Sequence, residues 1–187
     1  MNATKITLAA RLGAAPHISG LRQKARRLGL PGLDDLANEA VARGCYHYSP
    51  GFDHGLRSRV SERDFPNCEL AIALLTIANR YDPRILRIGA MLLGAEGNDP
   101  RTLARLAVWE RCEGVVRYLV TCALRYEPGS PFWLELLAAL PPGPMPKEGV
   151  LPHHSRFALD PGLIAPKTFG KPNWLRPRVQ RSVSHAA

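Results

Sequence analysis

Three prolines recur at a fixed interval of 17 residues in the leucine-rich middle of the chain: Pro66, Pro83 and Pro100. Proline is excluded from helix interiors because it lacks an N–H group and its ring clashes with the preceding turn, but it is favoured at the first helical position. Asp82 and Asp99 precede the last two of these prolines, and aspartate is a good N-cap. The interval therefore marks the beginnings of successive short helices.

The same pattern extends beyond these three positions. Ser130 and Pro131 precede the apolar run FWLELLAAL, whereas no proline stands near Arg117, where the interval would place the next start. Helices of about three turns build both compact bundles and helical-hairpin repeats. The sequence therefore predicts an all-α fold, either a helical bundle or a short helical-hairpin repeat stack, with an extended basic C-terminal arm.

Charge divides the chain into three parts. Residues 1–60 hold nine Lys/Arg and four Asp/Glu, residues 61–141 hold nine and ten, and residues 142–187 hold seven and two. We interpret these parts as a small basic helical unit, a neutral helical core and a proline-rich basic arm. Basic ends suit contact with a polyanion, either a nucleic acid or an acidic protein surface. The alternative is a solvated surface that only keeps the protein in solution.

The stretch ITLAARLGAAPHISGLRQKA resembles a helix-turn-helix. In that motif a small residue of the first helix packs against the second helix, a glycine permits the turn, and apolar residues anchor the recognition helix. Ala9, Gly13, Ile18 and Leu21 fit these roles. The usual interval between the glycine and the first anchor exceeds that from Gly13 to Ile18 by one residue, and Pro16 lies where the second helix should begin. The alternative is two ordinary helices with a basic outer face.

The candidate nucleic-acid-binding residues come from both basic ends. In the N-terminal unit they follow the predicted turn, and in the arm they follow the last aromatic residue, so that both sets could reach phosphates. They are Ser19, Arg22, Lys24, Arg26, Arg27, Arg176, Arg178 and Arg181.

Residues 142–187 contain eight prolines, so this segment cannot form long helices. Large apolar side chains nevertheless recur through it, and leaving them in water is unfavourable. We expect the arm to lie extended along its own helical body or along a partner, with Phe169 and Trp174 as docking anchors. A flexible tail that contacts nothing is the alternative.

One set of residues could bind a metal ion. Cys45, His47, His54 and Cys68 offer two thiolates and two imidazoles, which is a possible tetrahedral zinc set. Cys45 and His47 are closer in sequence than zinc ligands usually are, and Cys68 falls inside a predicted helix. We therefore expect reduced thiols in a polar loop and a helix, with no metal and no cofactor.

Motifs of catalysis are missing from the sequence, which contains no Gly-x-Ser-x-Gly elbow, phosphate-binding lysine loop or Gly-x-Gly-x-x-Gly turn. The acids Glu110 and Glu113 are expected at the surface, and the aromatic residues Trp109, Phe132 and Trp133 in the core.

No apolar run approaches the roughly 18 residues of a membrane span. The start of the chain lacks the apolar core of a signal peptide, which predicts a cytoplasmic protein without membrane contact. We expect a non-enzymatic nucleic-acid-associated or assembly subunit of a larger complex. The alternative is a protein-interaction adaptor with a helical groove and no nucleic acid, and a zinc- or thiol-dependent enzyme is a third hypothesis.

Overall fold

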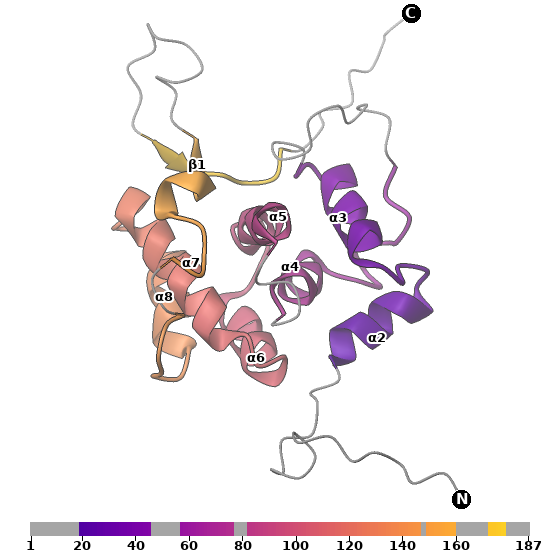
Figure 1. The fold of residues 1–187 in the computed structure, drawn as a ribbon, viewed down its shortest axis with the longest axis horizontal. Helices are drawn as coiled ribbons and strands as arrows, with labels where there is room; N and C mark the ends of the chain where they lie inside the picture. Colours follow the sequence, from indigo (N-terminus) through magenta and orange to yellow (C-terminus); the bar gives the residue numbers. More distant parts are fainter. Residues whose placement is uncertain (1–18, 46–56, 77–81, 147–148, 160–171, 179–187) are drawn as a thin grey trace, which may run out of the picture.

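The computed structural model describes residues 19–45, 57–76, 82–146, 149–159 and 172–178 of the chain. Within these ranges the protein is mostly helical, as the sequence predicts, with one two-stranded ribbon (Figure 1). The elements are α2 (Gly20–Arg27), α3 (Leu33–Ala42), α4 (Asn67–Leu75), α5 (Pro83–Leu93), α6 (Pro100–Trp109), α7 (Glu113–Tyr126), α8 (Pro131–Ala139), the 3-10 helix η3 (His154–Phe157), β1 (Ala158–Leu159) and β2 (Asn173–Trp174).

The predicted helix beginnings are confirmed. The Asp82 carboxylate accepts hydrogen bonds from two amides in the first turn of α5, and Asp99 accepts one from the Thr102 amide in α6 at 2.7 Å. Ser130 precedes α8, which also begins with a proline. Pro66 differs slightly, because it is the N-cap of α4 and the helix proper begins one residue later. An aspartate cap and a proline thus mark the starts of α5 and α6, whereas Pro66 and Ser130 make no side-chain cap hydrogen bond at α4 and α8.

Helix α4 lies in the middle of the molecule and packs against α2, α3, α5 and α6 (Figure 1). All its residues from Leu70 to Leu75 are buried. A helix that is apolar on every side must be surrounded by other elements. Its closest neighbour is α5, where Gly89 permits the approach, because a Cβ at that position would lie 2.8 Å from Cδ2 of Leu75.

Helices α7 and α8 cover the side of the molecule opposite α2 and α3, and α6 lies between the two sides (Figure 1). Trp133 of α8 is fully buried, as predicted, and the half-buried Phe132 packs edge-on against it. Trp109 was expected in the core, and this prediction is wrong: 69% of it is exposed. Leu103 and Ala107 lie on the buried face of α6, whereas Trp109 lies one turn beyond the exposed Arg105.

The prediction that Glu110 lies at the surface is also wrong. Only 2% of this residue is exposed, and its Oε1 accepts a hydrogen bond from the Leu21 amide at 2.9 Å. The carboxylate therefore satisfies one of the unpaired N–H groups at the start of α2 and joins that helix to the end of α6.

Candidate functional site

The basic helix α2 begins at Gly20. Ser19 is its N-cap, and the Ser19 hydroxyl accepts a hydrogen bond from the Arg22 amide at 3.1 Å. Leu21 and Ala25 form the buried face, so the following turn presents Arg26 and Arg27 to solvent. Neither guanidinium makes an ion pair within the described ranges of the chain.

Lys24 has a different environment from its neighbours. Its Nζ lies 2.6 Å from Oε2 of Glu69 on α4 and 5.7 Å from the centre of the Phe65 ring. The ammonium group is therefore directed toward the body of the protein, where it holds α2 against α4. The structure thus separates Lys24 from the outward-facing Arg26 and Arg27.

The helix-turn-helix resemblance can be followed only in part. Ala9, Gly13 and Ile18, which carry the first helix, the turn and the first anchor of the motif, lie outside the described residues. Leu21 is buried in the role that the motif assigns to it. The interpretation of α2 as a recognition helix remains a prediction.

The C-terminal segment 172–178 contacts the helices through Trp174. Only 3% of this residue is exposed, and its indole N–H donates a hydrogen bond to the Ala90 carbonyl of α5 at 3.2 Å. Its ring packs against Trp133 and Phe157, each with a centroid separation of 5.6 Å. A short antiparallel ribbon with residues 158–159 supports it. The other predicted anchor, Phe169, lies outside the described residues, as does Arg181.

Arg176 forms a two-pronged contact with Glu127 at the end of α7. Its two terminal nitrogens each donate to one carboxylate oxygen, and the same carboxylate accepts a hydrogen bond from Trp133. Partial burial acts to raise the pKa of Glu127, but the hydrogen bonds from Arg176 and Trp133 outweigh it and leave the pKa below its ordinary value. Arg176 therefore fastens the arm to the body in this structure.

The arm reaches the N-terminal part of the protein at Arg178. Its amide donates a hydrogen bond to the Gly44 carbonyl just beyond α3, at 3.1 Å. Gly44 has a φ of 100°, and a Cβ there would lie 2.3 Å from the Arg178 carbonyl oxygen, so only glycine fits. The described segments 19–45 and 172–178, one from each basic part of the sequence, thus meet at this hydrogen bond, with the side chain of Arg178 exposed at the junction.

A buried charge network organises the region next to this junction. Glu39 and Arg43 of α3 form an ion pair at 2.9 Å, with side-chain exposures of 0% and 2%. Arg43 also donates to the carbonyl oxygens of Phe65 and Val60, and Glu39 accepts from the Arg59 amide. This pair was not among the residues predicted from the sequence, although a spacing of four residues on a helix is a signal for such a pair.

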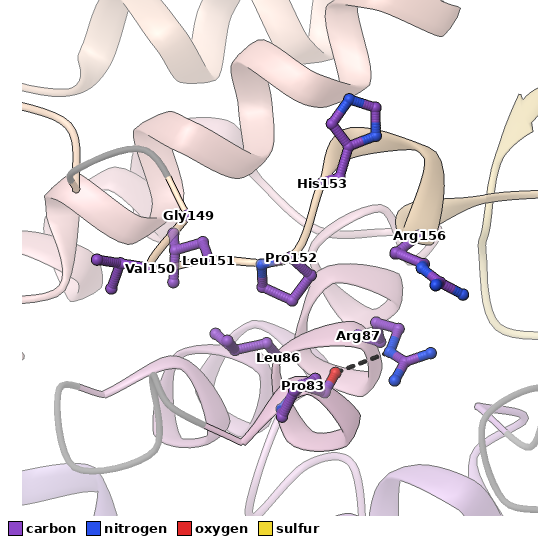
Figure 2. A pocket seen from close by; sticks show the side chains of 9 residues that line it. All are labelled: Pro83, Leu86, Arg87, Gly149, Val150, Leu151, Pro152, His153 and Arg156. Carbon is purple, nitrogen blue, oxygen red and sulfur yellow. Dashed lines mark hydrogen bonds between the residues drawn. The ribbon is translucent and has the colours of Figure 1, made fainter.

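A pocket of about 430 Å³ opens between the start of α5 and residues 149–156 (Figure 2). The side chains of Arg87 and Arg156 extend to the same side of the pocket, and Nε of Arg87 donates to the Pro83 carbonyl at 2.9 Å. His153 rises from the loop on the side away from α5. Two guanidinium groups make this rim positively charged, which suits an anion.

The next residue, His154, has a structural partner. Its Nδ1 lies 2.8 Å from the hydroxyl of Tyr126, which links η3 to α7. Burial, with smaller effects of His153 and Arg125, lowers the pKa of His154. The lowered pKa favours the neutral imidazole, which serves as a hydrogen-bonding partner for the tyrosine.

The proposed zinc ligands are only partly described. Cys45 is fully buried at the end of α3, and burial raises the pKa of its thiol far above the ordinary value. Burial also raises the pKa of Cys68. His47 and His54 lie outside the described residues, and the part that is described contains no group of three His, Cys, Asp or Glu residues arranged for a metal ion.

Comparison with known protein families, with curated proteins and with solved structures finds no match for this chain. No helix within the described ranges is long and apolar enough to span a lipid bilayer.

Proposed function

We propose that this protein is a non-enzymatic subunit that binds a polyanion, with a nucleic acid as the main candidate, through its basic ends. The observation that carries the proposal is the outward position of Arg26 and Arg27 on α2. Two adjacent, exposed arginines without acidic partners attract phosphates at little desolvation cost, and they release counterions from the polyanion on binding.

The position of the arm supports the proposal. Its backbone joins the N-terminal part at Gly44, which brings the exposed Arg178 next to that part. Arg57 and Arg63 follow α3 in sequence and are exposed as well, whereas the exposed Arg59 pairs with Asp35 at 3.3 Å. Cations that share one part of a surface raise the local concentration of an anionic partner more than scattered cations do.

The proposal includes a finer description of the architecture. We treat the helices as a bundle, because α4 packs against helices on several sides instead of only against its neighbours in a stack. We treat residues 142–187 as a basic arm, whose described residues 172–178 lie on this bundle and reach Gly44 just beyond α3.

Fluorescence anisotropy with labelled duplex DNA and labelled single-stranded RNA tests the proposal. Charge reversal at Arg26→Glu/Arg27→Glu should weaken binding at least about tenfold, because attraction to phosphates becomes repulsion. Lys24 is left intact, since a carboxylate at that position would face Glu69 and disturb the fold.

The matched control is Arg105→Glu/Arg125→Glu, which changes the net charge equally at two exposed arginines of α6 and α7. This control should bind within about twofold of the wild type at physiological salt, because a charge beyond the Debye length of about 8 Å is largely screened. Equal weakening by both variants would show that only net charge matters and would contradict an interface on α2.

A protein-interaction adaptor remains the second candidate, and one observation favours it. Val108 and Trp109 at the end of α6 are 45% and 69% exposed. Adjacent exposed apolar residues are typical of protein contact sites. If this function is correct, partners captured from native lysate should resist nuclease treatment and be lost from Trp109→Ala, while Arg26→Glu/Arg27→Glu retains them.

A further inference from the structure

A second cavity, of about 420 Å³, lies between the first two turns of α7 and the segment 141–146. This segment is rich in proline and crosses close to the helix, since a Cβ at Gly114 would lie 3.2 Å from the Pro144 carbonyl oxygen. Prolines and Met145 form an apolar wall, and Glu113 and Arg117 of α7 line the cavity with charged groups. None of these residues belongs to the proposed polyanion interface.

Three buried polar atoms of these two side chains have no hydrogen-bond partner among the described residues. They are Nε and Nη2 of Arg117 and Oε2 of Glu113. Leaving a charged group buried without a partner costs more free energy than leaving a neutral one. Buried polar atoms of this kind are uncommon, and a bound ligand is one physical reason for them.

The identity of the two arginine atoms indicates the ligand chemistry. The N–H of Nε and one N–H of Nη2 lie on the same edge of the guanidinium, and this fork matches the two oxygens of a carboxylate or phosphate. Glu113 lies one turn before Arg117 on the same face of α7. An ionised carboxylate only accepts hydrogen bonds, so Glu113 repels a multiply charged phosphate and needs a donor.

We propose that this cavity binds a carboxylate that carries its own hydrogen-bond donor next to an apolar side chain. A free α-amino acid and the C-terminal residue of a peptide share this chemistry. The carboxylate takes the fork of Arg117, the ammonium or amide N–H donates to Glu113, and the side chain lies against the proline wall. The cavity volume falls within the range of about 300–1,000 Å³ for small-molecule sites.

Isothermal titration calorimetry with three probes tests the proposal on the full-length protein. L-leucine represents a free amino acid, N-acetyl-L-leucine represents a peptide C-terminus, and L-leucinamide lacks the carboxylate. We expect saturable binding of one or both carboxylates and at least about tenfold weaker binding of the amide, because the bidentate contact is lost. Preference for L-leucine assigns the free amino acid, and preference for N-acetyl-L-leucine assigns the peptide end.

Two variants locate the binding site. Arg117→Gln should weaken the binding of the two carboxylate probes at least about tenfold. Arg125→Gln makes the same substitution at an exposed position two turns later on α7 and should leave their binding unchanged. Circular dichroism checks that each variant is folded. Glu113→Gln should weaken the binding of L-leucine more than that of N-acetyl-L-leucine, because only L-leucine carries a positively charged ammonium group.

Three results would overturn the proposal. The first is the absence of heat with all three probes, which would mean that the cavity holds only water. The second is an affinity for L-leucinamide equal to that for the carboxylate probes. The third is that Arg125→Gln weakens binding as much as Arg117→Gln does. None of these results depends on whether α2 binds a polyanion.

Discussion

Helices α2 and α3 are neighbours in the basic N-terminal part of the protein, yet they use arginine in opposite ways. Arg43 of α3 is buried, bonded to Glu39 and to two carbonyl oxygens of the segment that leads to α4. Arg26 and Arg27 of α2 are exposed and make no ion pair among the described residues. The formal charge of a segment therefore does not equal the charge that a ligand can reach. Only the second kind of arginine is available to bind a polyanion.

The largest effect should come from breaking the buried pair. Glu39→Ala leaves Arg43 buried without its counter-charge, and removing one partner of such a pair typically costs about 3–5 kcal/mol. The free energy of unfolding, measured by urea titration, should fall by this amount. Arg26→Ala on α2 is the control and should change it by less than about 0.5 kcal/mol. Similar losses in both variants would remove the contrast between the two helices.

The second effect concerns the contact between arm and body. Trp174→Ala should lower the free energy of unfolding by about 3 kcal/mol, because a buried indole is removed from between Trp133 and Phe157. Limited proteolysis should then cut the arm faster than in the wild type. Trp109→Ala makes the same substitution at an exposed site and should be nearly neutral. Unchanged stability of Trp174→Ala would show that the arm adds nothing to the fold.

A smaller effect is expected at the start of α5. Asp82→Ala removes the N-cap that accepts from the amides of Arg84 and Ile85, at a cost of about 1 kcal/mol. The measurement is the melting temperature of Asp82→Ala. The control is Asp64→Ala, which makes the same substitution at an exposed residue outside the helices. Equal melting temperatures would argue against capping as the origin of the regular helix starts.

The smallest effect is the pH dependence of the Arg176–Glu127 contact. The folded-state pKa of Glu127 lies below its ordinary value of 4.5, so the contact stabilises the protein above about that pH. The stabilisation is lost as the pH falls through the folded-state pKa. The difference in unfolding free energy between the wild type and Glu127→Gln should therefore shrink as the pH falls from about 5 to about 3. A constant difference over this range would contradict the assignment.

The helix starts could be predicted because their causes are local. A proline and the aspartate before it act within one turn, so no distant residue decides the outcome. Trp109 could not be placed as easily, since a large apolar side chain near a helix end fits either face. Its spacing of four residues from Arg105 was the signal for the outer face, and the sequence analysis did not use it.

The candidate site was less predictable, because its pairings join distant parts of the chain. Lys24 bonds to Glu69 across 45 residues, and the Leu21 amide bonds to Glu110 across 89 residues. Composition indicates that residues 1–60 are basic, but only the packing of α2 on α4 shows which cation turns inward. The same holds for Glu110, whose burial depends on the approach of α2.

The central claim, that Arg26 and Arg27 contact phosphates, is tested most directly by the salt dependence of duplex-DNA binding. The slope of log K against log [salt] should become shallower by about 1.8 in Arg26→Gln/Arg27→Gln, because each lost phosphate contact removes about 0.9 from the slope. Arg105→Gln/Arg125→Gln should keep the wild-type slope. If the slope of the α2 variant is unchanged, these arginines do not contact phosphates, and the proposed function is contradicted.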